Sequence, residues 1–264
     1  MFSKKKIIII SISSDIGNSI ALNYLKTNKI IGTFNQSNQN TRSIFKHKNV
    51  YLKNVNLNKK SSIENFCKYI LKNHNNWSHI IFCNGDLNPI GEFTKVDFKK
   101  WEKSFNVNFM SVLNILNLLL KKNKKSRKIL FFAGDGTNDA VKYYSAYTLS
   151  KVILIKFTEL LDFEEKKIYV GILGPGVIKT KLHNSTFKSN IINLNKKESI
   201  KNISKKDTQN DLNQLNLCID WIFKNLRLIS GRNISLKFDK WGNKGLLRKL
   251  KKNYNLFKLR RYGN

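Results

Sequence analysis

The stretch KIIIISISSDIGNSIALNYL, residues 6–25, decides the fold of this 264-residue chain. It begins with a run of isoleucines, passes through the polar turn Ser13-Ser14-Asp15, and continues with apolar residues at helical spacing. A β-branched run that ends in a turn and leads into amphipathic periodicity predicts a buried strand followed by a helix. This strand-to-helix alternation is repeated along the chain.

Further apolar runs predict strands, and the periodic segments between them predict helices. The predicted strands are 29–34, 50–57, 79–85, 128–134, 168–176 and 231–239, and the predicted helices are 61–73, 97–123, 146–165 and 212–226. Continuous apolar strands that alternate with helices indicate a parallel sheet covered on both faces. The sequence therefore predicts an α/β fold, a Rossmann-like doubly wound parallel sheet, with residues 1–264 as one domain.

Two segments fall outside this alternation. Residues 183–211 are polar and lysine-rich without strong periodicity, and we expect them to form a mobile substrate loop. Residues 248–264 form a basic tail, with seven Lys and Arg residues between positions 248 and 261.

The composition is strongly basic, with 49 Lys and Arg against 17 Asp and Glu and a net charge of +32. Such a charge suits a polyanionic partner. However, 42 of the cations are Lys and only 7 are Arg, and 36 Asn and 30 Ile accompany them. Codons for Lys, Asn and Ile are all A/T-rich, so genomic base composition accounts for the excess, whereas nucleic-acid recognition favours Arg. We therefore expect no specific nucleic-acid partner.

Localisation follows from the apolar segments and the cysteines. No apolar stretch approaches the roughly 18 residues of a membrane helix. Cys67, Cys83 and Cys218 are widely spaced, with no CxxC pair and no clustered histidines, which predicts neither a disulfide framework nor a metal site. We expect a cytoplasmic protein with no membrane span.

A candidate catalytic pair lies in the predicted helix 146–165. Tyr147 and Lys151 are four residues apart, so they share one helix face, and they follow a strand that ends in AGDG. A phenol becomes a useful acid or base near neutral pH when a nearby cation favours the phenolate. At the first turn, the helix that begins near Gly17 offers free amides and a dipole that attract phosphate. Neither feature is specific by itself, because serines and an aspartate before a helix are ordinary caps and Tyr-x-x-x-Lys often occurs on helices by chance.

Together these residues resemble the short-chain dehydrogenase/reductase family, from about residue 5 to residue 180. The motifs that carry the resemblance occur in the family's order: SSDIG (13–17), CNG (83–85), NVN (106–108), YTLSK (147–151) and GPGVIKT (174–180). A narrower likeness is to the branch found with bacterial surface-polysaccharide genes. It lies in GDLNPIGEF (85–93), FFAGDGTN (131–138), SGRNISLKFDKW (230–241) and the terminal LRRY (259–262).

The resemblance implies an NAD(P)-dependent oxidoreductase that transfers hydride to or from a carbonyl or hydroxyl group, such as that of a sugar or lipid precursor. It implies Tyr147 as general acid or base, Lys151 as the cation that favours the phenolate and binds the nicotinamide ribose, and Asn108 as the holder of a water that connects Lys151 to solvent. It also implies a homo-oligomer, a dimer or tetramer, built on the helices 97–123 and 146–165. The residues that it assigns to cofactor binding are Ser11, Ser13, Ser14, Asp15, Ile16, Gly17, Asn35, Arg42, Asn54, Asn84, Gly85, Tyr147, Lys151, Pro175, Gly176, Val177 and Thr180.

The active-site pattern departs from the family at one point. The family's catalytic serine lies about thirteen residues before the tyrosine, where this chain has Gly134 with Ala133 beside it. Neither residue can donate a side-chain hydrogen bond, and losing one such donor typically costs about 10²–10³ in rate. Thr137 and Ser145 are the candidate replacements.

The cofactor-binding pattern departs at three points. Ser11 and Asp15 stand for two glycines of the turn, and Asn54 replaces the aspartate that usually contacts adenine. An aspartate beside a pyrophosphate is unfavourable unless it caps the helix and points away. The predicted strand 29–34 ends without the acidic residue that NAD binding favours, and Arg42 lies nearby. This pattern favours NADP, with NAD as the alternative.

Three functions remain open, in this order. The first is the oxidoreductase. The second is a catalytically weakened nucleotide-binding homologue that acts as a binding or scaffold subunit. The third is a basic protein that binds RNA or a membrane surface through residues 121–128 and its tail.

Overall fold

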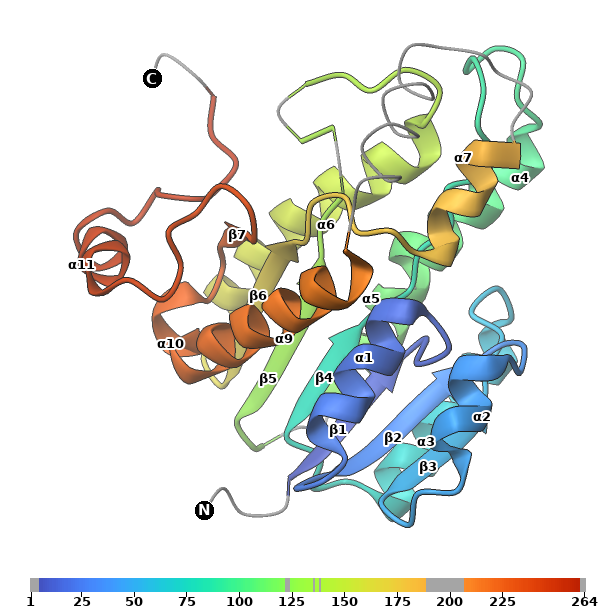
Figure 1. Cartoon of the computed structure of the whole chain (residues 1–264), viewed down its shortest axis with the longest axis horizontal. Helices are drawn as coiled ribbons and strands as arrows, with labels where there is room; N and C mark the ends of the chain where they lie inside the picture. Colours follow the sequence, from blue (N-terminus) through green and yellow to red (C-terminus); the bar gives the residue numbers. More distant parts are fainter. Residues whose placement is uncertain (1–4, 122–123, 135, 138, 189–206, 262–264) are drawn as a thin grey trace.

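Seven parallel strands form the central sheet, in the spatial order β3-β2-β1-β4-β5-β6-β7 (Figure 1). The computed structural model describes residues 5–121, 124–134, 136–137, 139–188 and 207–261. The strands are β1 (Lys6–Ile10), β2 (Lys29–Phe34), β3 (Val50–Asn54), β4 (His79–Phe82), β5 (Arg127–Phe132), β6 (Ile168–Gly174) and β7 (Asn233–Ser235). The strand order reverses between β1 and β4, and ligands of open α/β sheets bind at such a switch point, beyond the carboxyl ends of the strands.

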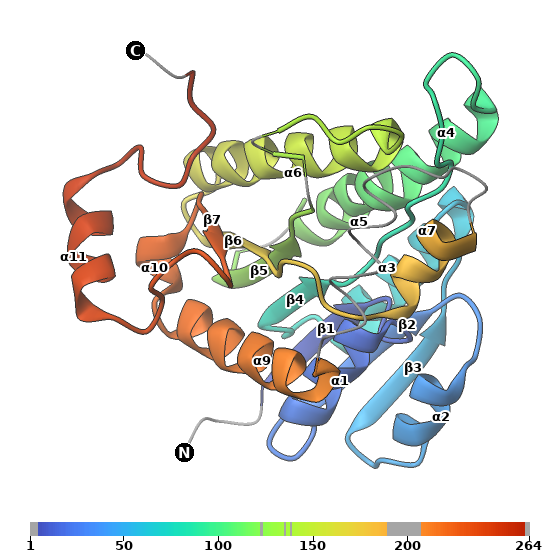
Figure 2. The ribbon, with the colours of Figure 1, turned by 45° about the horizontal axis from the view of Figure 1, so that its top comes forward.

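Helices cover both faces of this sheet (Figures 1 and 2). They are α1 (Asp15–Tyr24), α2 (Gln39–Phe45), α3 (Lys60–Asn73), α4 (Phe98–Phe105), α5 (Ser111–Leu120), α6 (Ser145–Glu164), α7 (Asn184–Lys188), α9 (Thr208–Lys224), α10 (Leu226–Ile229) and α11 (Lys244–Lys252). A π-helical turn, η1 (Asn106–Met110), joins α4 to α5, and a 3₁₀ turn, η2 (Lys181–His183), precedes α7.

The isoleucines of β1 explain why both faces need a cover. Ile8 and Ile10 point to one face, in a core cluster with residues of α3, α5 and α6. Ile7 and Ile9 point to the other face, in a cluster with residues of α1, α9, α10 and α11. Successive side chains of a strand alternate between faces, so a continuous apolar run is stable only when helices bury both. The predicted doubly wound fold is confirmed.

Details of the predicted elements differ. The predicted helix 97–123 contains the π-helical turn η1, β3 ends at Asn54, and β7 spans three residues. The helices α2 and α11 were not predicted; both are short and capped by asparagines. Of the predicted substrate loop 183–211, residues 184–188 are helical and α9 begins at Thr208, while residues 189–206 lie outside the described part.

The described part of the basic tail is folded against the domain. The buried guanidinium of Arg232 donates hydrogen bonds to the carbonyl oxygens of Leu250, Asn253 and Leu256. Arg260 forms a two-pronged ion pair with Glu159 of α6, with nitrogen–oxygen distances of 2.6 and 3.0 Å. These contacts pair three carbonyl oxygens and one exposed cation of the tail with other parts of the domain. Within the described residues, no helix is long and apolar enough to cross a membrane.

Candidate active site

The Lys151 ammonium is the most deeply buried charge at the carboxyl edge of the sheet. The Lys151 residue is 3% exposed, and its Nζ donates to the carbonyl oxygens of Phe132, at 3.0 Å, and Asn84, at 3.5 Å. These carbonyls end β5 and begin the loop after β4, so two neighbouring strands hold the cation. Burial lowers the pKa of Lys151 to about 8, although the nearby Cys83 opposes the shift. The ammonium therefore keeps its proton at neutral pH.

Tyr147 lies one helical turn before Lys151 on α6. The Lys151 Nζ is 5.6 Å from the centroid of the Tyr147 ring, so the helix brings the predicted pair together on one face. The main chain of α6 is fixed at this point, because Ala146 is fully buried and the Ser150 hydroxyl donates to the Tyr147 carbonyl oxygen at 2.6 Å. The phenol thus lies beside a buried cation on a rigid element.

Gly134 contacts the phenol where the family has a serine. A Cβ atom added at Gly134 would lie 2.6 Å from Tyr147 Cε1 and 2.8 Å from Tyr147 Oη. The two candidate replacement donors have other contacts: the Thr137 hydroxyl donates to the Gly134 carbonyl oxygen at 3.4 Å, and the Ser145 hydroxyl accepts a hydrogen bond from Trp101 Nε1 at 3.0 Å. Neither contact is directed at Tyr147.

Asn108 lies in the π-helical turn and is fully buried. Its Nδ2 donates to the Asp86 carbonyl oxygen, and its Oδ1 accepts from the Asp86 amide, each at 2.8 Å. The Asn84 Nδ2 donates to the Val107 carbonyl oxygen at 2.7 Å, while the buried Asn84 Oδ1 has no hydrogen-bond partner among the described residues. The asparagine side chain predicted to hold a water thus fixes the loop after β4. The sequence analysis did not assign a role to Asp86, whose contribution is made by its backbone and leaves no side-chain signal.

The first turn is tight and leads directly into α1. Ser11 has a φ of 60°, the left-handed conformation that favours glycine. The Ser14 hydroxyl caps α1 by accepting from the Gly17 amide at 3.0 Å. A Cβ atom at Gly17 would lie 2.6 Å from the Ser11 carbonyl oxygen, so a side chain cannot fit there. The glycine keeps the turn tight against the start of α1. The neighbouring Ile16 is partly buried and packs against the core cluster on this face of the sheet.

Asp15 joins this turn to two other segments. Its carboxylate accepts a hydrogen bond from the Lys181 amide at 2.7 Å and another from Asn40 Nδ2 at 2.9 Å. The Lys181 ammonium is 3.7 Å away, in a partly exposed ion pair. The Asp15 carboxylate is therefore the hydrogen-bond acceptor of the Lys181 amide, which lies beyond β6 and faces the first turn.

The residues predicted beyond β2 lie at the edge of the site. Asn54 Nδ2 donates to the Asn35 carbonyl oxygen at 2.8 Å, and the Arg42 side chain on α2 is exposed. The side chains of Asn38 and Asn40 both donate to the Ser13 carbonyl oxygen, at 2.9 and 3.0 Å. These two asparagines hold the β2 loop on the first turn, and the sequence analysis missed them because asparagine is abundant throughout the chain.

Residues 181–186, which follow Thr180, form a strap across the carboxyl edge. Besides the contact of Lys181 with Asp15, Leu182 approaches Gly85, and Ser185 accepts from Asn88 Nδ2 at 3.1 Å. The Tyr144 hydroxyl donates to Thr186 Oγ1 at 3.0 Å. A turn ahead of the strap contains Gly176, which has a φ of 65° and lies between Pro175 and Val177. It thus contacts the loops after β1 and β4 and the start of α6.

The family model for short chain dehydrogenases matches residues 5–190. The chain belongs to the short-chain dehydrogenase family. The uncharacterized oxidoreductase YIR035C of Saccharomyces cerevisiae is 26% identical over 113 residues, which are 42% of this chain and 44% of that protein. The crystal structure of YIR035C has a TM-score of 0.75 at 19% identity and covers 93% of this chain and 99% of its own.

Two further proteins are similar to this chain. The benzil reductase ((S)-benzoin forming) IRC24 of S. cerevisiae is 27% identical over 137 residues, 48% of this chain and 52% of the relative. A crystal structure of an actinorhodin polyketide ketoreductase with NADPH has a TM-score of 0.74 at 15% identity, covering 88% of this chain and 95% of its own. The chain spans about half the length of the curated relatives it matches. The match supports an oxidoreductase of this family, and the polysaccharide branch stays a prediction.

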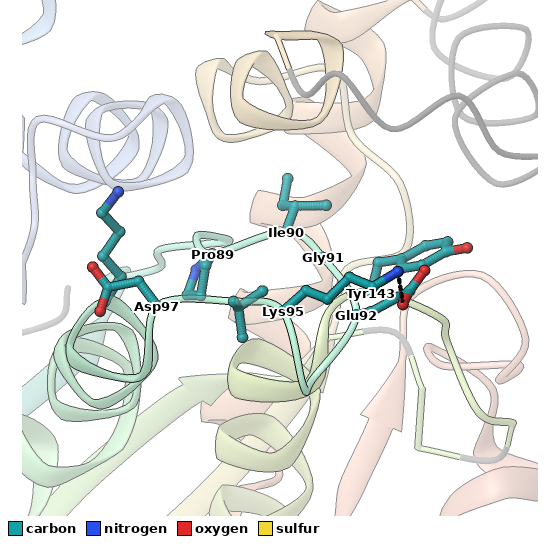
Figure 3. A pocket seen from close by; sticks show the side chains of 9 residues that line it. Pro89, Ile90, Gly91, Glu92, Lys95, Asp97 and Tyr143 are labelled. Atoms are coloured by element: carbon teal, nitrogen blue, oxygen red, sulfur yellow. Dashed lines mark ion pairs between the residues drawn. The ribbon is translucent and has the colours of Figure 1, made fainter.

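A cavity of about 400 Å³ lies between the loop after β4 and the residues before α6 of this short-chain dehydrogenase (Figure 3). Pro89, Ile90 and Tyr143 supply its apolar walls, and Glu92 forms an ion pair with Lys95 at 2.7 Å. The Gly91 amide donates to the Tyr143 carbonyl oxygen at 2.9 Å, which ties the two walls together. The residues that line the cavity do not include Tyr147, Lys151 or Asn108.

Proposed function

We propose that this chain is an NADP-dependent oxidoreductase that reduces a ketone or oxidises the corresponding alcohol. The observation that carries the proposal is the buried Lys151 ammonium, which is fixed by two carbonyl oxygens and lies 5.6 Å from the Tyr147 ring centroid. Burying a cation costs free energy even where hydrogen bonds offset part of that cost. A buried cation beside a tyrosine favours the phenolate.

The residues at the carboxyl edge fit a nicotinamide dinucleotide. The tight turn at Gly17 leaves the start of α1 accessible to an anion, and the buried Asn84 Oδ1 lacks a partner among the described residues. The first turn and Thr180 would hold the pyrophosphate and nicotinamide ends, and Lys151 the ribose. The bound cofactor supplies or accepts a hydride. Within the first turn, Asp15 carries a charge that opposes this binding.

The proton chemistry belongs to Tyr147. In reduction, a hydride adds to the carbonyl carbon, the carbonyl π electrons move to oxygen, and the Tyr147 hydroxyl gives that oxygen its proton. The resulting phenolate is stabilised by the Lys151 ammonium until it takes up a proton from solvent. In oxidation, the phenolate removes the hydroxyl proton as hydride leaves the carbon. Asn108 positions the loop that carries the Asn84 carbonyl, and through it the ammonium.

The cofactor and substrate preferences are part of the proposal. No carboxylate follows β2 in the run Asn35-Gln36-Ser37, and Arg42 is exposed nearby, which favours the 2′-phosphate of NADP. Because one relative is a benzil reductase, the first substrate to test is benzil, an aromatic vicinal diketone.

A homo-oligomer is also proposed, on the exposed apolar face of α6. Leu149, Ile153, Leu160 and Phe163 are between 39% and 77% exposed. Large apolar residues concentrated on one helix mark an interaction surface.

Binding and turnover together test the proposal. Fluorescence titration with NADPH and NADH measures cofactor affinity, and loss of NADPH absorbance with benzil and a panel of ketones measures turnover. We expect tighter binding of NADPH, and a loss of turnover of about 10²–10⁴ in Tyr147→Phe without loss of cofactor affinity. A wild-type protein that binds NADPH but reduces no carbonyl would instead favour the binding or scaffold subunit, to which Gly134 already points.

A further inference from the structure

Gly134 packs so closely against the Tyr147 ring that a Cβ atom at this position would overlap the ring. A Cβ atom at this position would lie 2.6 Å from Tyr147 Cε1, 2.9 Å from Cζ and 2.8 Å from Oη. Ordinary contacts of a Cβ atom begin at 3.4 Å. The three ring atoms therefore occupy the space that any side chain at position 134 requires.

The neighbouring glycine of the same loop shows the same relation to α6. A Cβ atom at Gly136 would lie 2.5 Å from Thr148 Cγ2, and Gly136 has a φ of 88°. The Thr137 hydroxyl donates back to the Gly134 carbonyl oxygen at 3.4 Å. The loop after β5 thus packs its backbone against two successive residues of α6, and a glycine is present at each contact.

Crowding at position 134 would move the phenol rather than the backbone. Gly134 directly follows β5, whose last residues pair with β6, and Ala133 is 4% exposed with its amide bonded to Leu173. The main chain of α6 is fixed at Ala146 and Ser150, as described above. The Tyr147 ring is joined to this main chain by a side chain with two rotatable bonds, so it can shift by rotation about them. To relieve the Oη contact from 2.8 Å to 3.4 Å, the hydroxyl must move by about 0.6 Å.

We propose that Gly134 is a positioning residue, whose missing side chain lets the Tyr147 phenol lie against the end of β5 beside the Lys151 ammonium. The inference rests on the proposed role of Tyr147 as proton donor. It changes the meaning of the lost serine: the tyrosine occupies the serine's space, so a serine put back at this position displaces the proton donor instead of assisting it. The Tyr147 phenol is therefore the side chain that donates a hydrogen bond and a proton to the substrate oxygen at the end of β5.

Kinetics of three variants test this inference. A misplacement approaching 1 Å can cost about 10²-fold in rate, so kcat in Gly134→Ala and Gly134→Ser should fall by about 10- to 100-fold. The KM for the ketone and the Kd for NADPH should stay within about twofold. The matched control is Gly245→Ala, at an exposed position in the first turn of α11, which should keep wild-type kcat. An unchanged or higher kcat in Gly134→Ser would overturn the inference.

A double-mutant cycle separates positioning from general damage. If Gly134 acts through the phenol, Gly134→Ala should cost nothing further in a Tyr147→Phe background. A full additional loss in that background would contradict the inference.

A readout without turnover separates this inference from the proposed function. In crystal structures of the wild type and Gly134→Ser, we expect the Tyr147 ring to be displaced while the β5 backbone stays in place. If the ring keeps its position and the backbone moves, the inference fails even when the protein is an active reductase. If the wild type reduces no carbonyl but the ring is displaced, the proposed function fails and the positional relation stands.

Discussion

Neutralising Asp15 should tighten cofactor binding, which is the opposite of what most substitutions in a binding site do. Asp15 is in the first turn of α1, and its carboxylate accepts from the Lys181 amide and from Asn40 Nδ2. A pyrophosphate bound at the start of this helix would meet that negative charge. Asp15→Asn keeps the size of the side chain and removes the charge.

The magnitude follows from competition between two anions for one helix terminus. An anion at a helix N-terminus is stabilised by about 0.3–2 kcal/mol. If Asp15→Asn returns that free energy to the pyrophosphate, the Kd for NADPH should fall by about 2- to 30-fold. The loss of a charge-assisted hydrogen bond to Lys181 should cost about 1 kcal/mol of stability, or roughly 2–4 °C in Tm.

The assay is a fluorescence titration with NADPH at low and high salt, with thermal unfolding measured in parallel. The matched control is Asp220→Asn, which removes one charge at the other end of α1, where Asp220 accepts from the Tyr24 hydroxyl. The gain in affinity should shrink at high salt and be absent in the control. Equal or weaker NADPH binding by Asp15→Asn would refute the reasoning. No binding by any variant would refute the proposed cofactor instead.

Three further predictions concern single side chains. Lys151→Met should abolish turnover yet raise Tm at pH 7, because it removes a buried charge. Burial lowers the pKa of Lys151 to about 8, so between pH 8 and 10.5 the folded state binds fewer protons than the unfolded state and the wild type should regain stability as pH rises. Thermal melts across that range check this. Glu159→Gln should destabilise the protein above about pH 4.5, and its stability should converge with that of the wild type as pH falls toward 2, because the hydrogen bond from Arg260 lowers the pKa of Glu159 to about 2. Acid titration followed by circular dichroism measures this, and parallel wild-type and variant curves would contradict it. Ser11→Gly should relieve the left-handed backbone at φ 60° and raise Tm by about 2–4 °C; an unchanged or lower Tm would show that Ser11 bears no strain.

The sheet and its layers could be predicted because apolar periodicity records burial directly. The run at Ile7–Ile10 required cover on both faces whatever packed there. The elements that were missed carry little of that signal. The helix α2 is seven residues long and held by an asparagine cap, and the π-helical turn at Asn106–Met110 preserves the apolar spacing around it. Capping and a one-residue change in hydrogen-bond register depend on local geometry that composition does not reveal.

The candidate site divides in the same way. Tyr147 and Lys151 could be paired from their spacing alone, because a helix places residues four apart on one face. The partners that give Lys151 its environment are backbone carbonyls of Phe132 and Asn84, from two other strands, and backbone atoms have no sequence signature.

The sequence by itself determined the class of fold, the alternation of strands with helices along the chain, and the shared helix face of Tyr147 and Lys151, because each depends on spacing along one element. Only the tertiary structure decided what surrounds that pair. It placed the Asp15 carboxylate on the Lys181 amide, 166 positions away in the chain, and the Tyr147 ring in the space that a side chain at position 134 would need. Both are contacts between segments brought together by the sheet, and their distances are set by the packing of whole elements rather than by the residues on either side.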